Sequence, residues 1–285
     1  MIHLTNTCKL NNLIHMKRRT IAATITSGGF GLHSGEYVEV TLSPHRGGIV
    51  FIRDTTKIPA TPENVIDTRL NTTLGSKGAR IATVEHLMSA LYGMGITDCI
   101  IEVSGDEIPS MDGSALPFVR MIQTATIEEL EKDARPIVID KPVRVEGKDG
   151  WIQVEPGMFS LSYEISFDNP AIGRQIYLYE GKDFVEEIAP ARTFGLLRDV
   201  MGMVSMGLTL GGGFHNALIF NDEDVLNPDG QRFEDECIRH KVLDMLGDLW
   251  LLGIPILGKF HAYKANHDLH VAMALKIKEA FDARR

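Results

Sequence analysis

The order of patterned segments along the chain constrains its fold more than any other feature of the sequence. Residues 37–44 (YVEVTLSP) alternate apolar and polar side chains, as a strand with one buried face does. The glycine-rich segment 27–35 before them predicts a turn between strands. The rest of the first half predicts, in order, a helix over 79–95, a strand over 98–105, a turn at Asp112-Gly113 and a second helix reaching residue 130.

The second half repeats this theme of strands followed by helices. Strand patterns occupy residues 151–156, 159–167 and 216–220, whereas helical patterns occupy 232–253 and 268–281. Two halves of similar size and similar element order predict an α+β fold of two related layered units, although no residue-level repeat is found.

A connector over 133–150 separates the two halves. We therefore predict an N-terminal domain over 16–134 and a C-terminal domain over 135–285. Residues 1–15 precede a second methionine, Met16. We expect them to be a disordered extension or to result from an early start codon.

Composition excludes several classes of protein. Of 285 residues 44% are hydrophobic, and the formal charge of −9 disfavours a broad nucleic-acid surface. The three cysteines lie far apart without CxxC spacing, which argues against a disulfide framework or a thiolate metal site. No apolar run is long enough to span a bilayer, and no secretion signal is recognised. We expect a cytoplasmic monomer without stable membrane insertion.

The pair Glu85-His86 lies at the start of the predicted helix over 79–95. With Thr83 as N-cap, Glu85 would complement the helix dipole, which is an ordinary structural role. A neutral His86 at the same place could instead bind a metal. No HExxH arrangement is present because Ala90 follows four residues after His86. Both interpretations stay open on these residues.

A second candidate is the polar stripe of His240, Asp244 and Asp248, which are spaced four residues apart on one predicted helix. The remaining positions of this helix are largely apolar, so burial is expected, and buried carboxylates need partners. A surface His-Asp pair is the alternative. A catalytic zinc site usually has three protein ligands, of which this helix would supply two.

Three histidines, His261, His267 and His270, lie close together before the final helix. One of them could act as a general acid near a metal-bound water, with Asp248 pairing to it. The glycine clusters contain neither GxxxxGK[ST] nor GxGxxG, and no GxSxG is found, so nucleotide-loop and serine-hydrolase signatures are absent. The residues thus indicate a possible metal site assembled from two halves.

Several long strings occur in order from about Met16 to near the C-terminus: TVEHLMSAL, MDGSALPFV, ARTFGLLRD, LGGGFHNALIF, RFEDECIRHKVLDMLGDL and AYKANH. Together they resemble one family, UDP-3-O-acyl-N-acetylglucosamine deacetylase, the zinc amidase of lipid A biosynthesis. The resemblance implies two similar domains, each a layered β-α-α-β sandwich, with helices facing each other and the active site between them.

The resemblance implies the following chemistry for the site. The reaction would be hydrolysis of the N-acetyl group of UDP-3-O-(3-hydroxyacyl)-N-acetylglucosamine, with one catalytic Zn²⁺, Fe²⁺ being compatible with the same donors. Glu85 would be the general base toward zinc-bound water, and His267 the general acid. By the same resemblance, the metal ligands would be His86, His240 and Asp244. Asp248 would orient His267, and the hydroxyl of Thr193 would donate to the tetrahedral intermediate.

Substrate contacts are also implied by the resemblance. Residues 194–217 resemble the insert that forms an apolar passage for the acyl chain. The corresponding substrate-binding positions are Lys241, Phe194 on the sugar, Phe167 near the nucleotide, and Leu32 and His33 from the first domain.

The sequence departs from the family pattern at three places. Asn71 stands where many members have a cysteine, and Gly150 where a basic residue often binds the diphosphate, a role in which we expect Lys148 to substitute. His267 follows Lys264 by three residues rather than four. A zinc amidohydrolase that ignores the UDP group, and a nucleotide-sugar or lipid-binding protein without activity, are the competing hypotheses.

Overall fold

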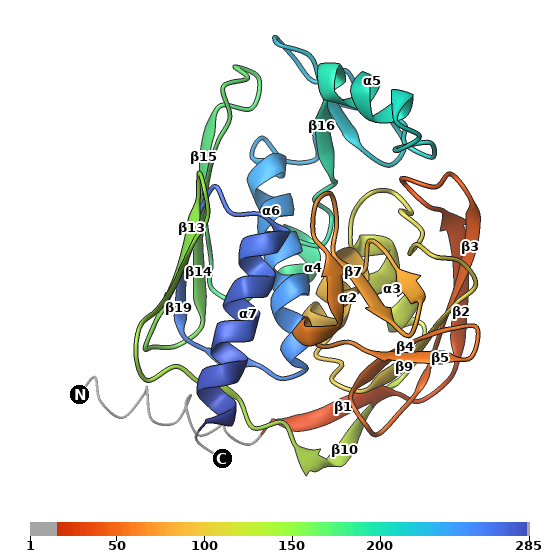
Figure 1. Ribbon diagram of the computed structural model, residues 1–285, viewed down its shortest axis with the longest axis vertical. Coiled ribbons are helices and arrows are strands. Elements are labelled where there is room, and N and C mark those ends of the chain that lie inside the picture. The colour runs from red at the N-terminus through yellow and green to blue at the C-terminus, as the bar shows by residue number, and fades with distance from the viewer. Residues whose placement is uncertain (1–15, 284–285) are drawn as a thin grey trace.

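The computed structural model describes residues 16–283, so the prediction made for residues 1–15 lies outside the described residues. The α+β fold with two sheet-rich halves is confirmed: each half has a five-stranded sheet on the outside of the molecule, and the helices lie between the two sheets (Figure 1). The domain boundary near residue 134 stays a prediction.

The sheet of the first half turns one face inward. Its strand β3 (Tyr37–Pro44), second from one edge, buries Val38, Val40 and Leu42, which alternate with more exposed residues as its period of two predicts. Helices α2 (Glu85–Gly93) and α3 (Leu116–Gln123) lie on the inner side. In order across the sheet, the strands are β2 (Ile25–Phe30), β3, β9 (Cys99–Val103), β4 (Ile49–Arg53) and β5 (Thr56–Pro59).

Several expected bounds in this half are wrong. The predicted second helix ends at Gln123, and β10 (Ile127–Asp133) is a strand that pairs antiparallel with β1 (Lys17–Ile21). The glutamates of β10 favour a helix by propensity, but the open edge of β1 offers backbone partners, and tertiary pairing overrides the local preference. The remaining elements are η1 (Pro62–Asn64), β6 (Val65–Asp67), β7 (Thr73–Ser76) and β8 (Ala79–Ile81).

The second half has the same plan. Strand β14 (Ser160–Ser166) buries Leu161, Tyr163 and Ile165 against helices α6 (Glu236–Leu249) and α7 (His267–Asp282). His261, which was expected in a loop, lies exposed on a strand of this sheet. In order across the sheet, the strands are β12 (Val143–Glu146), β13 (Trp151–Glu155), β19 (Lys259–Tyr263), β14 and β15 (Arg174–Tyr179).

Helices α2 and α6 join the two halves at close range. Gly247 on α6 faces the start of α2, where an added Cβ would lie 2.1 Å from the carbonyl oxygen of Glu85. A glycine is required at this crossing because any side chain would separate the backbones. The close approach brings the polar stripe of α6 next to Glu85 and His86.

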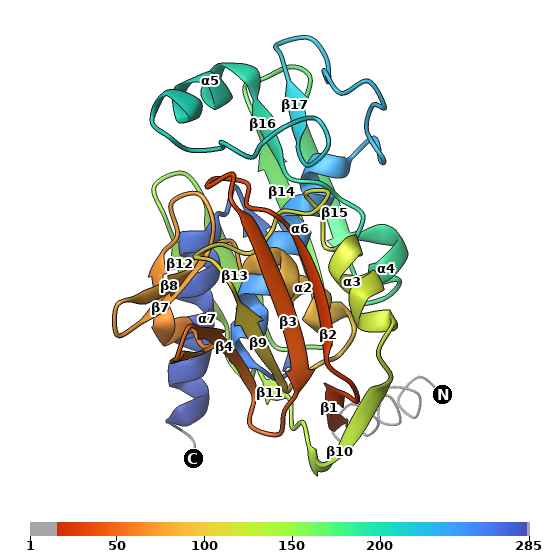
Figure 2. The same cartoon turned by 90° about the vertical axis from the view of Figure 1, so that its right-hand side faces the viewer.

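An insert extends from the second half at the end of the molecule opposite β1 and β10 (Figure 2). It comprises β16 (Phe194–Leu196), α5 (Leu197–Ser205) and β17 (Leu218–Phe220) and follows the short helix α4 (Phe184–Glu187). In the connector, β11 (Ile137–Val138) pairs with β18 (Ile256–Leu257), which follows the 3-10 turn η2 (Trp250–Leu252). Within residues 16–283, none of the helices has the length and apolar character needed to cross a bilayer.

Candidate metal centre and active site

The start of α2 differs from the predicted cap. The helix begins at Glu85, and Thr83 adopts φ +59°, a left-handed conformation that strains a β-branched residue. Its hydroxyl donates to the buried carboxylate of Glu107 instead of capping α2. Thr83 is therefore not the N-cap, and this anchored turn directs Glu85 and His86 toward α6, where both are buried.

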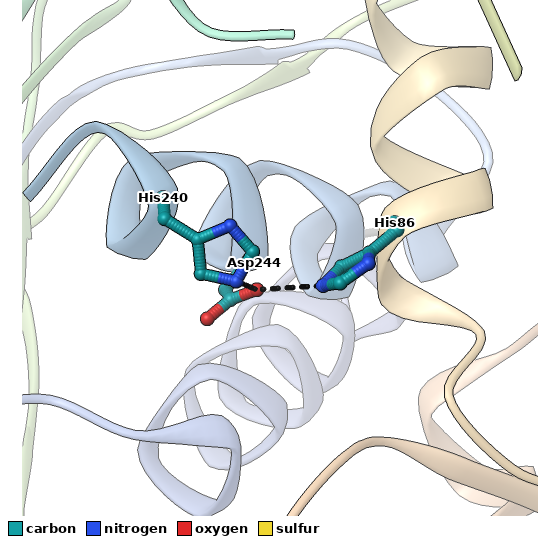
Figure 3. A group of neighbouring side chains, drawn as sticks. All are labelled: His86, His240 and Asp244. Carbon is teal, nitrogen blue, oxygen red and sulfur yellow. Dashed lines mark ion pairs between the residues drawn. The ribbon is translucent and has the colours of Figure 1, made fainter. Parts of the chain in front are cut away.

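Figure 3 shows the three side chains that meet between α2 and α6. The Nε2 atoms of His86 and His240 lie 3.6 and 3.3 Å from Oδ1 of Asp244. One ligand atom from each residue falls within 4.8 Å of the other two, and all three residues are buried. The structure thus brings together the three residues predicted as metal ligands, one from the first half and two from the second.

The hydrogen bonds of this trio fit a cation. His240 Nδ1 is 3.0 Å from the carbonyl oxygen of Ala191, which only a protonated Nδ1 can satisfy. Burial lowers the pKa of His240 to about 3, so its ring is neutral and Nε2 presents a lone pair to Asp244. Asp244 Oδ1 is buried and accepts no hydrogen bond from the described residues. Electron-pair donors that face each other in a buried place need a cation between them, and two imidazoles with a carboxylate suit zinc or iron.

Lys241 lies on the other side of the same carboxylate. Its Nζ donates to Asp244 Oδ2 at 2.7 Å and lies 5.6 Å from the ring centroid of Phe194. Phe194 in turn meets the half-exposed Phe167 edge to face, with ring centroids 5.6 Å apart. Lys241, Phe194 and Phe167 therefore form a row that leads outward from the trio.

A proton-transfer group lies beside the trio. His267 Nε2 is 4.0 Å from Glu85 Oε1, and His267 Nδ1 donates to Asp248 Oδ2 at 2.8 Å. Burial disfavours the charged His267, but the Asp248 carboxylate outweighs this effect and raises the pKa of His267 to about 9. Burial raises the pKa of Glu85. A carboxylate that readily accepts a proton thus faces an imidazolium that can give one.

Asp248, His267 and His270 also have ligand atoms within 4.8 Å of one another. Here, however, both histidines place Nδ1 at 2.8 Å from Asp248 Oδ2. Protons already occupy the space between these atoms, so this second group is a hydrogen-bond network, unlike the trio.

Two residues of the network were not predicted in these roles. Thr72 donates its backbone N–H to Glu85 Oε2 at 2.9 Å and its hydroxyl to Asp248 Oδ1. No sequence signal marks Thr72, because it lies in a loop before β7 and is separated in sequence from both partners. His270 carried a signal in its spacing, since it follows His267 by one turn of α7.

Four predicted residues line a cavity of about 360 Å³ under the insert: Leu32, His33, Thr193 and Phe194. The other walls are largely apolar side chains of the insert, such as Val200 and Met203. The loop of the first half holds the insert in place, because Leu210 N–H donates to His33 O and Gly211 N–H to Leu32 O, both at 3.1 Å.

The departures from the family pattern have local explanations. An added Cβ at Gly150 would lie 2.3 Å from the carbonyl oxygen of Lys264, so no side chain fits there. Lys148 is exposed, and its contact with a nucleotide stays a prediction. Asn71 accepts a hydrogen bond from the Thr73 hydroxyl at 2.8 Å.

Fold and site together define a two-domain α+β protein that can hold a metal ion between helices of its two halves. The family model of UDP-3-O-acyl N-acetylglycosamine deacetylase matches residues 18–279, and the chain belongs to this family.

Curated relatives with this family's name align with the chain over nearly their whole length. The UDP-3-O-acyl-N-acetylglucosamine deacetylase of Campylobacter hominis is 44% identical over 269 residues, which is 92% of either chain. That of Haemophilus influenzae is 46% identical over 90% of this chain and 88% of its own. That of Psychrobacter arcticus is 42% identical over 97% of this chain and 90% of its own.

Proposed function

We propose that this protein hydrolyses the N-acetyl group of UDP-3-O-(3-hydroxyacyl)-N-acetylglucosamine, releasing acetate in the committed step of lipid A biosynthesis. Membership of the deacetylase family and the names of relatives at 42–46% identity support the reaction. The observation that carries the proposal is the buried Asp244 Oδ1, which accepts no hydrogen bond within the described part of the chain and is faced by two imidazole nitrogens.

His86, His240 and Asp244 would hold the metal, which we propose to be one Zn²⁺, with Fe²⁺ as the alternative that the same donors suit. When bound, the ion polarises the amide carbonyl and lowers the pKa of a water ligand to about 7. The bond from His240 Nδ1 to Ala191 keeps Nε2 free for this task, and Lys241 holds the Asp244 carboxylate in place.

Glu85 takes a proton from the attacking water, and His267 donates one to the departing amine nitrogen. The 4.0 Å separation of Glu85 Oε1 and His267 Nε2 supports these roles, because both atoms reach the same reacting centre. Asp248 keeps His267 charged, so that His267 is protonated before the amide bond breaks. The hydroxyl of Thr193 donates to the oxyanion.

The cavity under the insert takes the acyl chain, whose burial contributes about 0.8 kcal/mol per CH₂. Phe194 packs on the sugar, Lys241 binds substrate, and Phe167 lies toward the nucleotide. Leu32 and His33 close the cavity from the first half. A cytoplasmic location and a monomeric state stay predictions.

The test combines metal analysis with acetate release from the acylated UDP-sugar. We expect about one zinc or iron per chain, and a loss of about 10²–10⁴-fold in kcat for Glu85→Ala with metal content retained. Full activity in Glu85→Ala would overturn the mechanism. Equal turnover of an acylated sugar without UDP would favour a broader amidohydrolase, and binding without acetate release by the wild type would favour a binding protein.

A further inference from the structure

Asp248 binds two imidazoles through one oxygen. His267 and His270 follow each other by one turn on α7, and the Nδ1 atom of each lies 2.8 Å from Asp248 Oδ2. The other oxygen, Oδ1, accepts the Thr72 hydroxyl. The carboxylate is fully buried and fixed on three sides, although orienting His267 would need only one of these bonds.

The far side of the His270 ring contacts Tyr163 on β14. Tyr163 Oη lies 3.1 Å from His270 Nε2 and 2.9 Å from the carbonyl oxygen of Ala265. Asp248 Oδ2 can only accept, so His270 Nδ1 carries a proton, whereas the single phenol O–H of Tyr163 donates to the Ala265 carbonyl and the phenol oxygen lies against His270 Nε2. The charged and titratable groups acting on His270 are Asp248 and Asp244 from α6, Tyr163 from β14 and His267 from α7. Burial lowers the pKa of His270.

We infer that His270 is a positioning residue for the proton donor His267: its Nδ1–H holds Asp248 Oδ2, and Tyr163 contacts the far side of its ring. This inference rests on the proposed deacetylase function. With His270 in place, the Asp248 carboxylate cannot rotate about its Cβ–Cγ bond without breaking bonds at both oxygens. The ring of His267 is thereby held with Nε2 toward Glu85, and a small misplacement of such a group is costly to the rate.

A matched pair of variants separates this role from simple packing. In His270→Asn the amide nitrogen takes the place of Nδ1 and can still donate to Asp248, whereas contact with Tyr163 is lost. In His270→Gln the amide reaches toward Tyr163 and leaves Asp248 with one imidazole fewer. We expect His270→Asn to keep kcat within about threefold of wild type, and His270→Gln to lose about tenfold in kcat with KM within about twofold.

The tautomer is measured without reference to activity. In ¹⁵N-edited NMR spectra of the imidazole rings, His270 should carry a proton on Nδ1, and Tyr163→Phe should shift its Nε2 resonance. His270→Gln with wild-type kcat, His270→Asn as impaired as His270→Gln, or a His270 protonated at Nε2 alone would each overturn the inference. Absence of acetate release by the wild type would instead refute the proposed function, and the NMR spectra would still test the hydrogen bond.

Discussion

Asp244 and Asp248 lie one turn apart on α6, yet their oxygens meet different partners. Asp244 Oδ1 is faced by two imidazole nitrogens and accepts no hydrogen bond from residues 16–283, whereas Asp248 receives three hydrogen bonds from Thr72, His267 and His270. The same side chain therefore suits a metal ligand at one position and an orienting carboxylate at the next. The partners, all of which except His240 come from other elements, decide the difference.

At the scale of single residues, the pH dependence of the reaction should follow Glu85 and His267. Burial raises the pKa of Glu85, so kcat/KM should rise with pH as Glu85 loses its proton. The pKa of His267 is raised to about 9, so kcat/KM should fall as pH increases through about 9 and the acid is lost. A bell-shaped profile of kcat/KM is the expected measurement.

Asp248→Asn is the control for the alkaline side of that profile. Without the carboxylate, burial lowers the pKa of His267, so the fall in kcat/KM should move to lower pH. An alkaline limb that stays in place in Asp248→Asn would show that His267 is not the group that titrates.

At the scale of elements, the crossing of α2 and α6 sets the geometry of the site. The Cβ of Gly247→Ala would lie 2.1 Å from the Glu85 carbonyl oxygen, so the two helices must separate. We expect the free energy of unfolding to fall by about 1–3 kcal/mol, as in other overpacked cores. Metal affinity should fall as well, because His86 moves away from His240 and Asp244. Denaturant unfolding and metal titration measure the two effects.

Gly202→Ala in α5 is the matched control for this variant. An added Cβ at Gly202 meets no atom within 4 Å, and the position is helical. We expect this change to leave metal affinity unaltered and to stabilise the fold by a few tenths of a kcal/mol to about 1 kcal/mol. Equal metal affinity in both glycine variants would contradict the role assigned to the crossing.

At the scale of the whole molecule, the proposed metal links the two halves, because His86 comes from one and His240 from the other. A ligand that binds only the folded state stabilises it by about 2.7 kcal/mol at a free concentration about one hundred times its Kd. Removing the metal with a chelator should therefore lower Tm, and returning stoichiometric zinc should restore it. Thermal unfolding monitored by circular dichroism checks both steps.

His86→Ala provides the comparison for that measurement. This variant keeps the α6 ligands but loses the ligand from the first half, so its Tm should respond little to chelator or zinc. A Tm of the wild type that is insensitive to chelator would refute a metal bridge between the halves.

Periodicity carried enough information to predict most elements. The strand β3 and the helices α6 and α7 follow from apolar spacing, since each must bury one face. Local pattern failed for β10, whose glutamates favour a helix, and for Thr83, whose conformation is set by a hydrogen bond to Glu107. In both cases a partner distant in sequence overrode the local preference.

The sequence by itself determined the α+β class and, through the resemblance of its motifs, the family and the set of ionisable residues. The tertiary structure decided which of these residues meet: His86 and His240 around Asp244, and His267 and His270 on Asp248. It also supplied Thr72, Ala191 and Tyr163, which no motif marks. The physical reason is that spacing along one helix aligns residues on one face, whereas contacts between elements depend on close packing, such as that at Gly247.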